Sequence, residues 1–351
     1  MKISLHNTAL DRSGNTPLTA QLQQLIDEID RAGGGTLVVS PGDWMTGTLV
    51  LPSNFTLHLE AGARLLASPH AEDYPAELTQ TVAELSRMAL IYARDAQHIT
   101  LSGEGSLVGG ASAWFSASAD AQGYRQPKTL RPRMLVLEGC QQVRIRDITI
   151  SDSPMWTAHL VSCNQVFIQN LTIDNDLALS NTDALDIDSC QHVHISDSYF
   201  SAADDGICVK TTRKPEGLQQ PTRHVVVSNC LIRSKSCAIK IGTETFADIS
   251  HIQPRHWPGL PRRRPVQPDD LQQHSVRLPS RPPVPLGQSR PGVYLRAPPR
   301  PAGAAGKGRG HYLQPAFWGE RRGHQPACGN AGRYPPRHLQ WAFIAAACWP
   351  V

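Results

Sequence analysis

Six aspartates occur in the stretch from Asn181 to Lys210, and their spacing is the feature of this chain that most suggests chemistry. Asp183 is followed after twenty-one residues by the pair Asp204-Asp205. An unpaired buried carboxylate is costly, so this density predicts either a wet polar wall or a set of groups gathered to move protons. We favour the second interpretation for these three. The others, which we expect to cap strand ends in contact with water, are Asp186, Asp188 and Asp197.

Short strands recur around this stretch. A polar residue leads into a short apolar run at residues 97–101, 142–145, 165–168, 192–195 and 224–227. The last four runs are separated by 23, 27 and 32 residues, and a second short strand follows each of them. A repeat of this length predicts a solenoid, in which each coil stacks on the last and buries a continuous core. Because no helix occurs in each repeat, a parallel β-helix fits best.

An amphipathic helix precedes the strands. Apolar residues recur at helical spacing between residues 17 and 32, and three glycines at 33–35 end the pattern. Strand-like runs follow at 37–39, 48–51 and 55–59. We expect this helix to cover the N-terminal end of the solenoid, because the terminal units of a solenoid must be closed off.

The repeat gives the aspartate spacing its meaning. Asp183 and Asp204 are separated by about one coil, and equivalent positions on neighbouring coils lie about 4.8 Å apart. Like charges held this close raise the pKa of at least one carboxyl group. A protonated carboxylic acid beside ionised carboxylates suits glycoside hydrolysis, in which one group protonates the leaving oxygen while another activates water. Carboxyl groups roughly 6.5–9.5 Å apart leave room for that water and invert the anomeric centre.

Several motifs in order resemble those of the family 28 glycoside hydrolases, the polygalacturonases. Asn181-Thr182-Asp183 corresponds to the family's NTD motif, and Ala203-Asp204-Asp205 to its G-D-D motif. Residues 33–36, 57–63 and 153–159 are also similar to bacterial members, so the resemblance covers about residues 17–250. It implies a right-handed parallel β-helix and an inverting hydrolysis of α-1,4 links between galacturonic acid units in pectin-type chains. Asp204 would be the general acid, Asp183 and Asp205 would activate water, and Asn181 would support them. No metal or cofactor is expected.

Two family motifs are missing. No histidine occurs between residues 234 and 244, where the family has G-H-G, and no R-I-K segment occurs near 265–285. Lys235 and Lys240 are therefore candidates to bind the uronate carboxylate, with a solvated coil edge as the alternative. Further candidates for substrate binding are Lys210, His159 and Trp156, although Trp156 could equally be a packing residue.

The chain changes composition after about residue 252. Residues 1–252 have 19 Lys and Arg against 27 Asp and Glu, whereas residues 253–351 have 15 against 3 and hold 18 of the 28 prolines. We interpret 1–252 as a glycosidase domain, incomplete at its C-terminal end, and 253–351 as an irregular or disordered Pro/Arg-rich tail. A basic binding tail, a Pro-rich linker and a shifted reading frame are the alternatives. We favour the shifted frame, and expect the loss of the last coils to impair activity.

The first residues contain no apolar run long enough for a signal peptide, and no later stretch is long enough to span a membrane. We therefore expect a cytoplasmic monomer that acts on short oligosaccharides, which favours release of sugars from chain ends. The eight cysteines form no CxxC pair, so we expect small apolar fillers at turns and no zinc site.

Three other functions remain open. A pectate lyase could use the same solenoid with calcium held by aspartates and an arginine base. A non-catalytic β-helix could bind carbohydrate or form a structural spike. Nucleic-acid binding through the basic tail is the weakest of the three, and its signature would be a steep dependence on salt.

Overall fold

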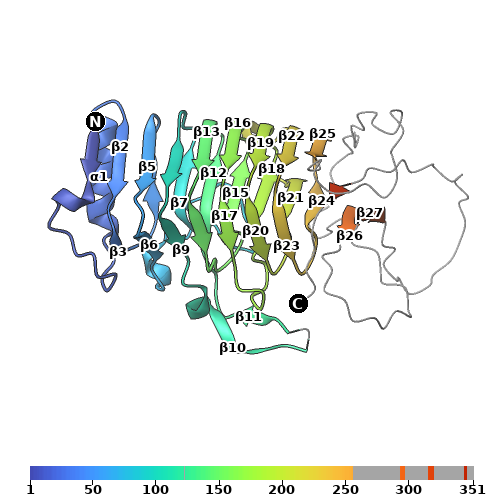
Figure 1. Cartoon of the computed structure of the whole chain (residues 1–351), viewed down its shortest axis with the longest axis horizontal. Coiled ribbons are helices and arrows are strands. Elements are labelled where there is room, and N and C mark those ends of the chain that lie inside the picture. Colours follow the sequence, from blue (N-terminus) through green and yellow to red (C-terminus); the bar gives the residue numbers. More distant parts are fainter. Residues whose placement is uncertain (122, 256–292, 297–314, 320–343, 346–351) are drawn as a thin grey trace, which may run out of the picture.

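The computed structural model describes residues 1–121, 123–255, 293–296, 315–319 and 344–345. Three sheets of parallel strands wind round one axis, and the coils follow one another along the length of the molecule (Figure 1). Each complete coil passes from a strand of sheet A to one of sheet B and then to one of sheet C. The prediction of a parallel β-helix is confirmed.

Sheet A contains four of the repeated runs found in the sequence and the end of the fifth, at residues 100–101. Its strands are β1 (Lys2–Ser4), β2 (Gly35–Val39), β5 (Phe55–Leu59), β8 (Thr100–Gly103), β13 (Gln141–Arg146), β16 (Asn164–Gln169), β19 (Gln191–Ser196), β22 (Thr222–Ser228) and β25 (Ile249–Arg255).

Sheet B contains the second short strand of each repeat. Its strands are β3 (Gly42–Thr46), β6 (Ala63–Ala67), β9 (Ser106–Val108), β14 (Thr149–Ser151), β17 (Thr172–Asp174), β20 (Tyr199–Ala202) and β23 (Leu231–Ser234).

Sheet C closes each coil. Its parallel strands are β4 (Leu49–Val50), β7 (Ala89–Arg94), β12 (Arg133–Glu138), β15 (Ala158–Val161), β18 (Leu185–Asp188), β21 (Ile207–Thr211) and β24 (Ile239–Thr245). Three short antiparallel strands continue the sheet: β26 (Val293–Arg296), β27 (Pro315–Gly319) and β28 (Ile344–Ala345). Most of residues 253–351, for which we predicted a disordered or frame-shifted tail, lie outside the described residues.

The other elements are short or terminal. Helix α1 (Thr19–Arg31) buries Leu22, Ile26 and Ile29 and packs beside β2 at the N-terminal end of the coils (Figure 1), as expected for a cap. A hairpin of β10 (Phe115–Ala119) and β11 (Arg125–Pro127) projects from the stack. The 3₁₀ turns are η1 (Leu5–Asn7), η2 (Ala71–Asp73), η3 (Ala111–Trp114) and η4 (Glu216–Leu218).

The solenoid interior is built by columns of like residues. Leu160, Ile187 and Val209 are paired from coil to coil and are completely buried. Cys140, Cys163 and Cys190 are likewise fully buried between sheets C and A, each with a free thiol. The prediction of small apolar fillers is therefore confirmed for these three, whereas Cys230, for which it was also made, is only partly buried against the core.

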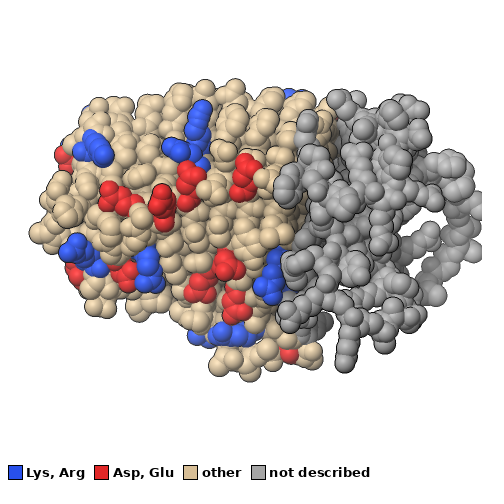
Figure 2. Space-filling model, viewed as in Figure 1, with Lys and Arg blue, Asp and Glu red and all other residues tan. Residues whose placement is uncertain are grey.

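The surface is mixed in charge. On the face shown in Figure 2, acidic and basic side chains lie in small groups among neutral residues. None of the helices in the described ranges has the length and apolar character needed to cross a bilayer.

Stacked interior side chains should carry the stability of the coils. We expect Phe200→Ala to lower the free energy of unfolding by about 3–5 kcal/mol, because Phe200 is 0% exposed and its removal leaves a cavity. Phe167→Ala is the matched control, since Phe167 is 45% exposed on sheet A. Urea unfolding followed by circular dichroism measures both, and equal midpoints for the two variants would contradict the description of the core.

Candidate active site

Asp183, Asp204 and Asp205 meet at the turns that lead from sheet B into sheet C. One carboxylate oxygen from each lies within 4.8 Å of the others. Asp183 comes two residues before β18, and Asp204 and Asp205 come shortly before β21, the next strand of sheet C. We call these three residues the acid cluster. The prediction that the repeat brings them together is confirmed.

Backbone pairing between the coils holds this arrangement. Ala184 N donates to Asp205 O at 2.9 Å, and Leu185 N donates to Gly206 O at 3.0 Å. The Thr182 hydroxyl accepts a hydrogen bond from Ala203 N at 3.3 Å, which ties the two turns together. A side chain at Gly206 would collide with Ile232, since its Cβ would lie 2.3 Å from that residue's Cγ2. The same Cβ would lie 2.7 Å from Ala238 O, so the following coil packs too closely on this turn for any residue but glycine.

The three carboxyl groups have different environments. Asp183 is 4% exposed, and its Oδ1 has no hydrogen-bond partner among the described residues. Burial, together with the neighbouring Asp186 and Asp204, raises its pKa well above the ordinary value. Asp204 is half-buried, and burial followed by the charge of Asp205 also raises its pKa. Protons are therefore retained in the cluster at a pH where an isolated aspartate has lost its own.

Asp205 is held by a hydroxyl and a cation. Ser236 Oγ donates to its Oδ1 at 2.9 Å, and Lys240 Nζ lies 2.8 Å from its Oδ2. Both partners come from the coil after Asp205, in the segment where the resembling family has a histidine motif. Lys240 therefore forms a charge-assisted contact with this carboxylate. Lys240 thus contacts the acid cluster directly.

Asn181 lies at the edge of the cluster with its backbone in the left-handed region, at φ 57°. Its Oδ1 accepts a hydrogen bond from Arg131 Nη2 at 3.0 Å. The same guanidinium donates to the backbone oxygens of Pro154 and Ser180. Arg131 therefore fixes the turn that carries Asn181, and the role of Asn181 beside the aspartates stays a prediction.

The hairpin of β10 and β11 lies beside the acid cluster. Its Tyr124 hydroxyl donates to Ala203 O at 3.3 Å, one residue before Asp204. The Lys235 ammonium lies 4.2 Å from the centre of the Tyr124 ring and donates to Leu177 O at 3.1 Å. Burial and the charges of Asp204 and Asp120 raise the pKa of Tyr124. Tyr124 and exposed Lys235 therefore form one wall beside Asp204.

Trp156 and Lys210 lie behind the acid cluster, away from solvent. Trp156 is 6% exposed, packs with Ala83 and Met155, and has the Lys210 ammonium 3.7 Å from its ring centre. Lys210 is 3% exposed and pairs with Asp186 at 2.9 Å. The prediction that these two side chains contact sugar is contradicted by this burial. Trp156 is the packing residue that we had considered as the alternative.

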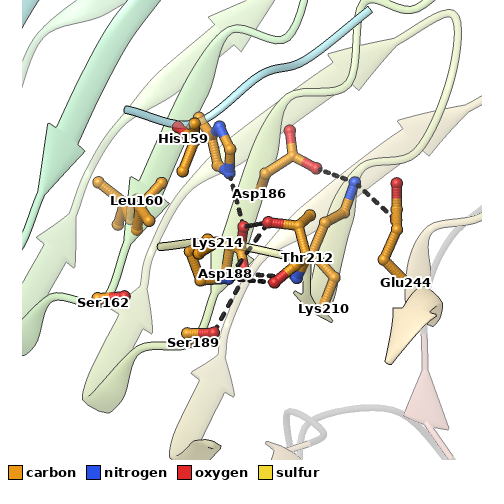
Figure 3. Close-up of polar contacts among 12 residues, drawn as sticks. His159, Leu160, Ser162, Asp186, Asp188, Ser189, Lys210, Thr212, Lys214 and Glu244 are labelled. Atoms are coloured by element: carbon orange, nitrogen blue, oxygen red, sulfur yellow. Dashed lines mark hydrogen bonds and ion pairs between the residues drawn. The ribbon is translucent and has the colours of Figure 1, made fainter. Parts of the chain in front are cut away.

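The prediction of a sugar contact for His159 is contradicted as well. His159 is 0% exposed and belongs to a buried polar network on the outer face of sheet C (Figure 3). Arg133 Nη1 lies 2.7 Å from His159 Nδ1, and His159 Nε2 lies 3.2 Å from Asp188 Oδ2. Because a guanidinium can only donate, His159 carries its proton on Nε2 and donates to Asp188. Burial lowers the pKa of His159 to about 4, which keeps the ring neutral.

Asp186 and Asp188 are not the wet strand caps that the sequence suggested. Both are completely buried, whereas Asp197 is exposed at a turn, where Asn229 donates to it. Asp188 pairs with Lys214 and accepts hydrogen bonds from Thr212 N and Oγ1 (Figure 3). Burial alone would raise the pKa of Asp188, but Lys214 and His159 lower it below the ordinary value. The alternating pattern predicted exposure to water for Asp186 and Asp188, but the outer face of sheet C is covered by other segments of the chain.

Sequence reasoning missed Ser236, Tyr124 and Arg131. Ser236 could have been found, because it follows Asp205 by 31 residues, close to the 32-residue spacing of that part of the repeat. Tyr124 and Arg131 belong to the excursion between β9 and β12 and its return, where no periodic pattern marks a position.

A solenoid that gathers three carboxylates beside a lysine has the form of an acid–base hydrolytic site. The family model described as "Glycosyl hydrolases family 28" matches residues 48–238, and the chain belongs to this family.

Individual relatives agree with this assignment. A probable polygalacturonase from Vitis vinifera is 28% identical over 68% of this chain and 51% of its own length. An exo-poly-alpha-D-galacturonosidase from Dickeya chrysanthemi is 23% identical over 68% of this chain and 47% of its own. The structure of an exopolygalacturonase from Thermotoga maritima shares the fold, with a TM-score of 0.62 at 24% identity over 73% of this chain and 65% of that one. The chain spans about half the length of the two sequence relatives.

Removing the charge of Asp188 should unfold the network around it. We expect Asp188→Asn to lower the free energy of unfolding by about 3–5 kcal/mol, because Lys214 would be left buried without its partner. Since the pKa of Asp188 is lowered in the folded state, its contribution is present above the ordinary carboxyl pKa of about 3.9 and is lost as the pH falls below that value.

Asp197→Asn, at an exposed turn, is the matched control and should leave stability nearly unchanged. Thermal unfolding at neutral pH and at about pH 3 checks both statements. A loss as small as that of the control, or one that grows toward acid pH, would contradict the role given to the network.

Proposed function

We propose that this chain hydrolyses α-1,4 links between galacturonic acid units in pectin-derived saccharides. The observation that carries the proposal is the acid cluster, with its oxygens within 4.8 Å and two raised pKa values, in a member of family 28. The names of the Vitis and Dickeya relatives support galacturonan as the substrate class.

Asp204 is the proposed general acid. It is the most exposed member of the cluster, and its raised pKa keeps a proton available at mildly acidic pH. It would give that proton to the glycosidic oxygen as the bond to the anomeric carbon breaks. Asp183 and Asp205 would hold the water that attacks the same carbon. This water would lose its proton to Asp205, the carboxylate that Lys240 and Ser236 hold in place. The products are a reducing sugar and the released alcohol end.

We propose inversion at the anomeric carbon, as the family resemblance implies. The closest oxygens of the cluster lie nearer than the roughly 6.5–9.5 Å between carboxyl groups that is usual for inverting enzymes. Three carboxyl groups instead of two are available here, so water need not lie between the closest pair. Proton NMR of the first product anomer measures the outcome directly.

Substrate recognition is proposed for the polar groups beside Asp204. Lys235 and Asn181 reach solvent at this edge, and Tyr124 offers a ring and a hydroxyl next to them. A uronate carboxylate near Lys235 would form a charge-assisted contact. We further propose a cytoplasmic monomer that cleaves from chain ends; the name of the exo-acting Dickeya relative supports this cleavage mode. The product profile on polygalacturonate checks the cleavage mode.

A calcium-dependent lyase is a second candidate, favoured by one observation. Three carboxylate oxygens this close could hold a divalent cation. A lyase would require calcium and release an unsaturated product that absorbs ultraviolet light, whereas the hydrolase would release reducing sugar in the presence of a chelator.

Asp204→Asn should abolish hydrolysis. Loss of the proton donor is expected to reduce kcat by about 10²–10⁴-fold, with little change in binding. Reducing-sugar release from polygalacturonate, measured with chelator present, tests this, and Asp197→Asn is the matched control. Activity that survives in Asp204→Asn would overturn the assignment. No reducing-sugar release by the unmodified chain would overturn the proposed function.

Lys240→Met should change the pH profile as well as the rate. Lys240 lowers the pKa of Asp204, so its removal raises that pKa. The general acid then stays protonated to higher pH, so the alkaline limb of the pH profile of kcat shifts to higher pH. We also expect kcat to fall about tenfold, since Asp205 loses its cation. Lys240→Arg keeps the charge and should return the alkaline limb to its original pH. An alkaline limb that stays at the same pH in Lys240→Met would contradict the assigned contact.

A further inference from the structure

The outer face of sheet A differs in charge from the rest of the solenoid. The five neighbouring strands β13, β16, β19, β22 and β25 contain no aspartate or glutamate in their sequences, although residues 1–252 as a whole have more acidic than basic residues. We call the outer surface of these strands the basic face. It holds none of the residues of the acid cluster, which lies where sheet B leads into sheet C.

Planar and basic groups stack on this face from coil to coil. In one column the Arg144 guanidinium lies 5.6 Å from the centre of the Phe167 ring, and Phe167 stacks on His194 at 5.3 Å with 12° between the planes. Phe167 is 45% exposed, so an apolar ring surface lies open to solvent. Exposed aromatic rings beside cations are the groups that bind the apolar face and the carboxylate of a uronic acid.

A second column runs beside the first. His192, His224 and His251 are exposed and stack at 5.0 and 4.8 Å. Loss of solvation, then repulsion by the neighbouring His251, His192 and Arg223, lowers the pKa of His224. The other polar neighbours of the stack are Asn164, which contacts His192, and Ser250, which contacts His251. An anion over the stack would relieve this repulsion.

The stack is poorly arranged for a metal ion. Parallel rings one strand spacing apart place equivalent nitrogens about 5 Å from one another, whereas nitrogens that share one zinc ion each lie about 2.0–2.1 Å from it. A chain of negative charges repeated along the solenoid axis fits the columns better than a single cation does.

We propose that the basic face is a second carbohydrate-binding surface, which holds an anionic polyuronate chain apart from the acid cluster. The columns repeat about every 4.8 Å along the axis, so one extended chain can meet Arg144, Phe167 and His194 in turn. Such a surface keeps the polymer close while its ends reach the catalytic centre. The choice of polyuronate rests on the proposed function, whereas the existence of an anion-binding face does not.

The experiment measures binding in an Asp204→Asn background, so that no substrate is consumed. Affinity electrophoresis in polygalacturonate gels compares this protein with one that also carries Arg144→Ala, Phe167→Ala and His194→Ala. We expect the triple change to weaken binding by about tenfold. We also expect binding to weaken with added salt.

Arg64→Ala with Leu231→Ala is the matched control, because both side chains are exposed on sheet B. It should bind as the background does. Unchanged binding in the triple variant would overturn the proposal, and so would equal retention of the background protein by duplex DNA or dextran. The triple change can also be made in protein that keeps Asp204. Loss of polymer retention with intact turnover of short oligosaccharides in that variant would support the proposal. If the chain proves inactive as a hydrolase, the comparison of the background and triple variants still tests whether the basic face binds the polymer.

Discussion

The pairing of one coil with the next is the constraint on which the rest of the structure depends. Each strand of sheet C is bonded to the strand one coil away, which puts Asp186 beside Cys208 and fixes the turns that precede them. The chemistry follows from this register, since Asp183 can meet Asp205 only if the intervening coil has the right length. A slip of one residue would turn every side chain of the strand to the opposite face. The acid cluster is thus a product of backbone pairing as much as of side-chain type.

Two buried carboxylates on the same coil have opposite environments. Asp188 is surrounded by a lysine, a protonated ring nitrogen, a hydroxyl and a backbone amide, all of which favour its charged form. Asp183 has an oxygen without a hydrogen-bond partner among the described residues and acidic neighbours instead. The first environment stabilises the fold, and the second stores a proton. Two aspartates five positions apart therefore have pKa values shifted in opposite directions, because their surroundings differ.

Periodicity made much of this architecture predictable. The runs that the sequence marked at 142–145, 165–168, 192–195 and 224–227 all lie within strands of sheet A, and the one-coil separation of Asp183 from Asp204 held. The fates of Asp186, Asp188 and His159 could not be predicted, because alternation shows which residues leave the interior but not what covers them. Here Thr79 and Thr81 lie over one part of sheet C and Thr212 and Lys214 over another. These covering segments have no repeat of their own.

The hairpin of β10 and β11 leaves the solenoid well before the acid cluster, yet its strand β11 reaches the turn that leads to Asp183. Arg125 N donates to Ala178 O at 2.7 Å, so two insertions from different coils support each other. Their lengths are consequently coupled. A deletion in one would leave the other without its brace, and viable variants of this scaffold should lengthen or shorten both excursions together.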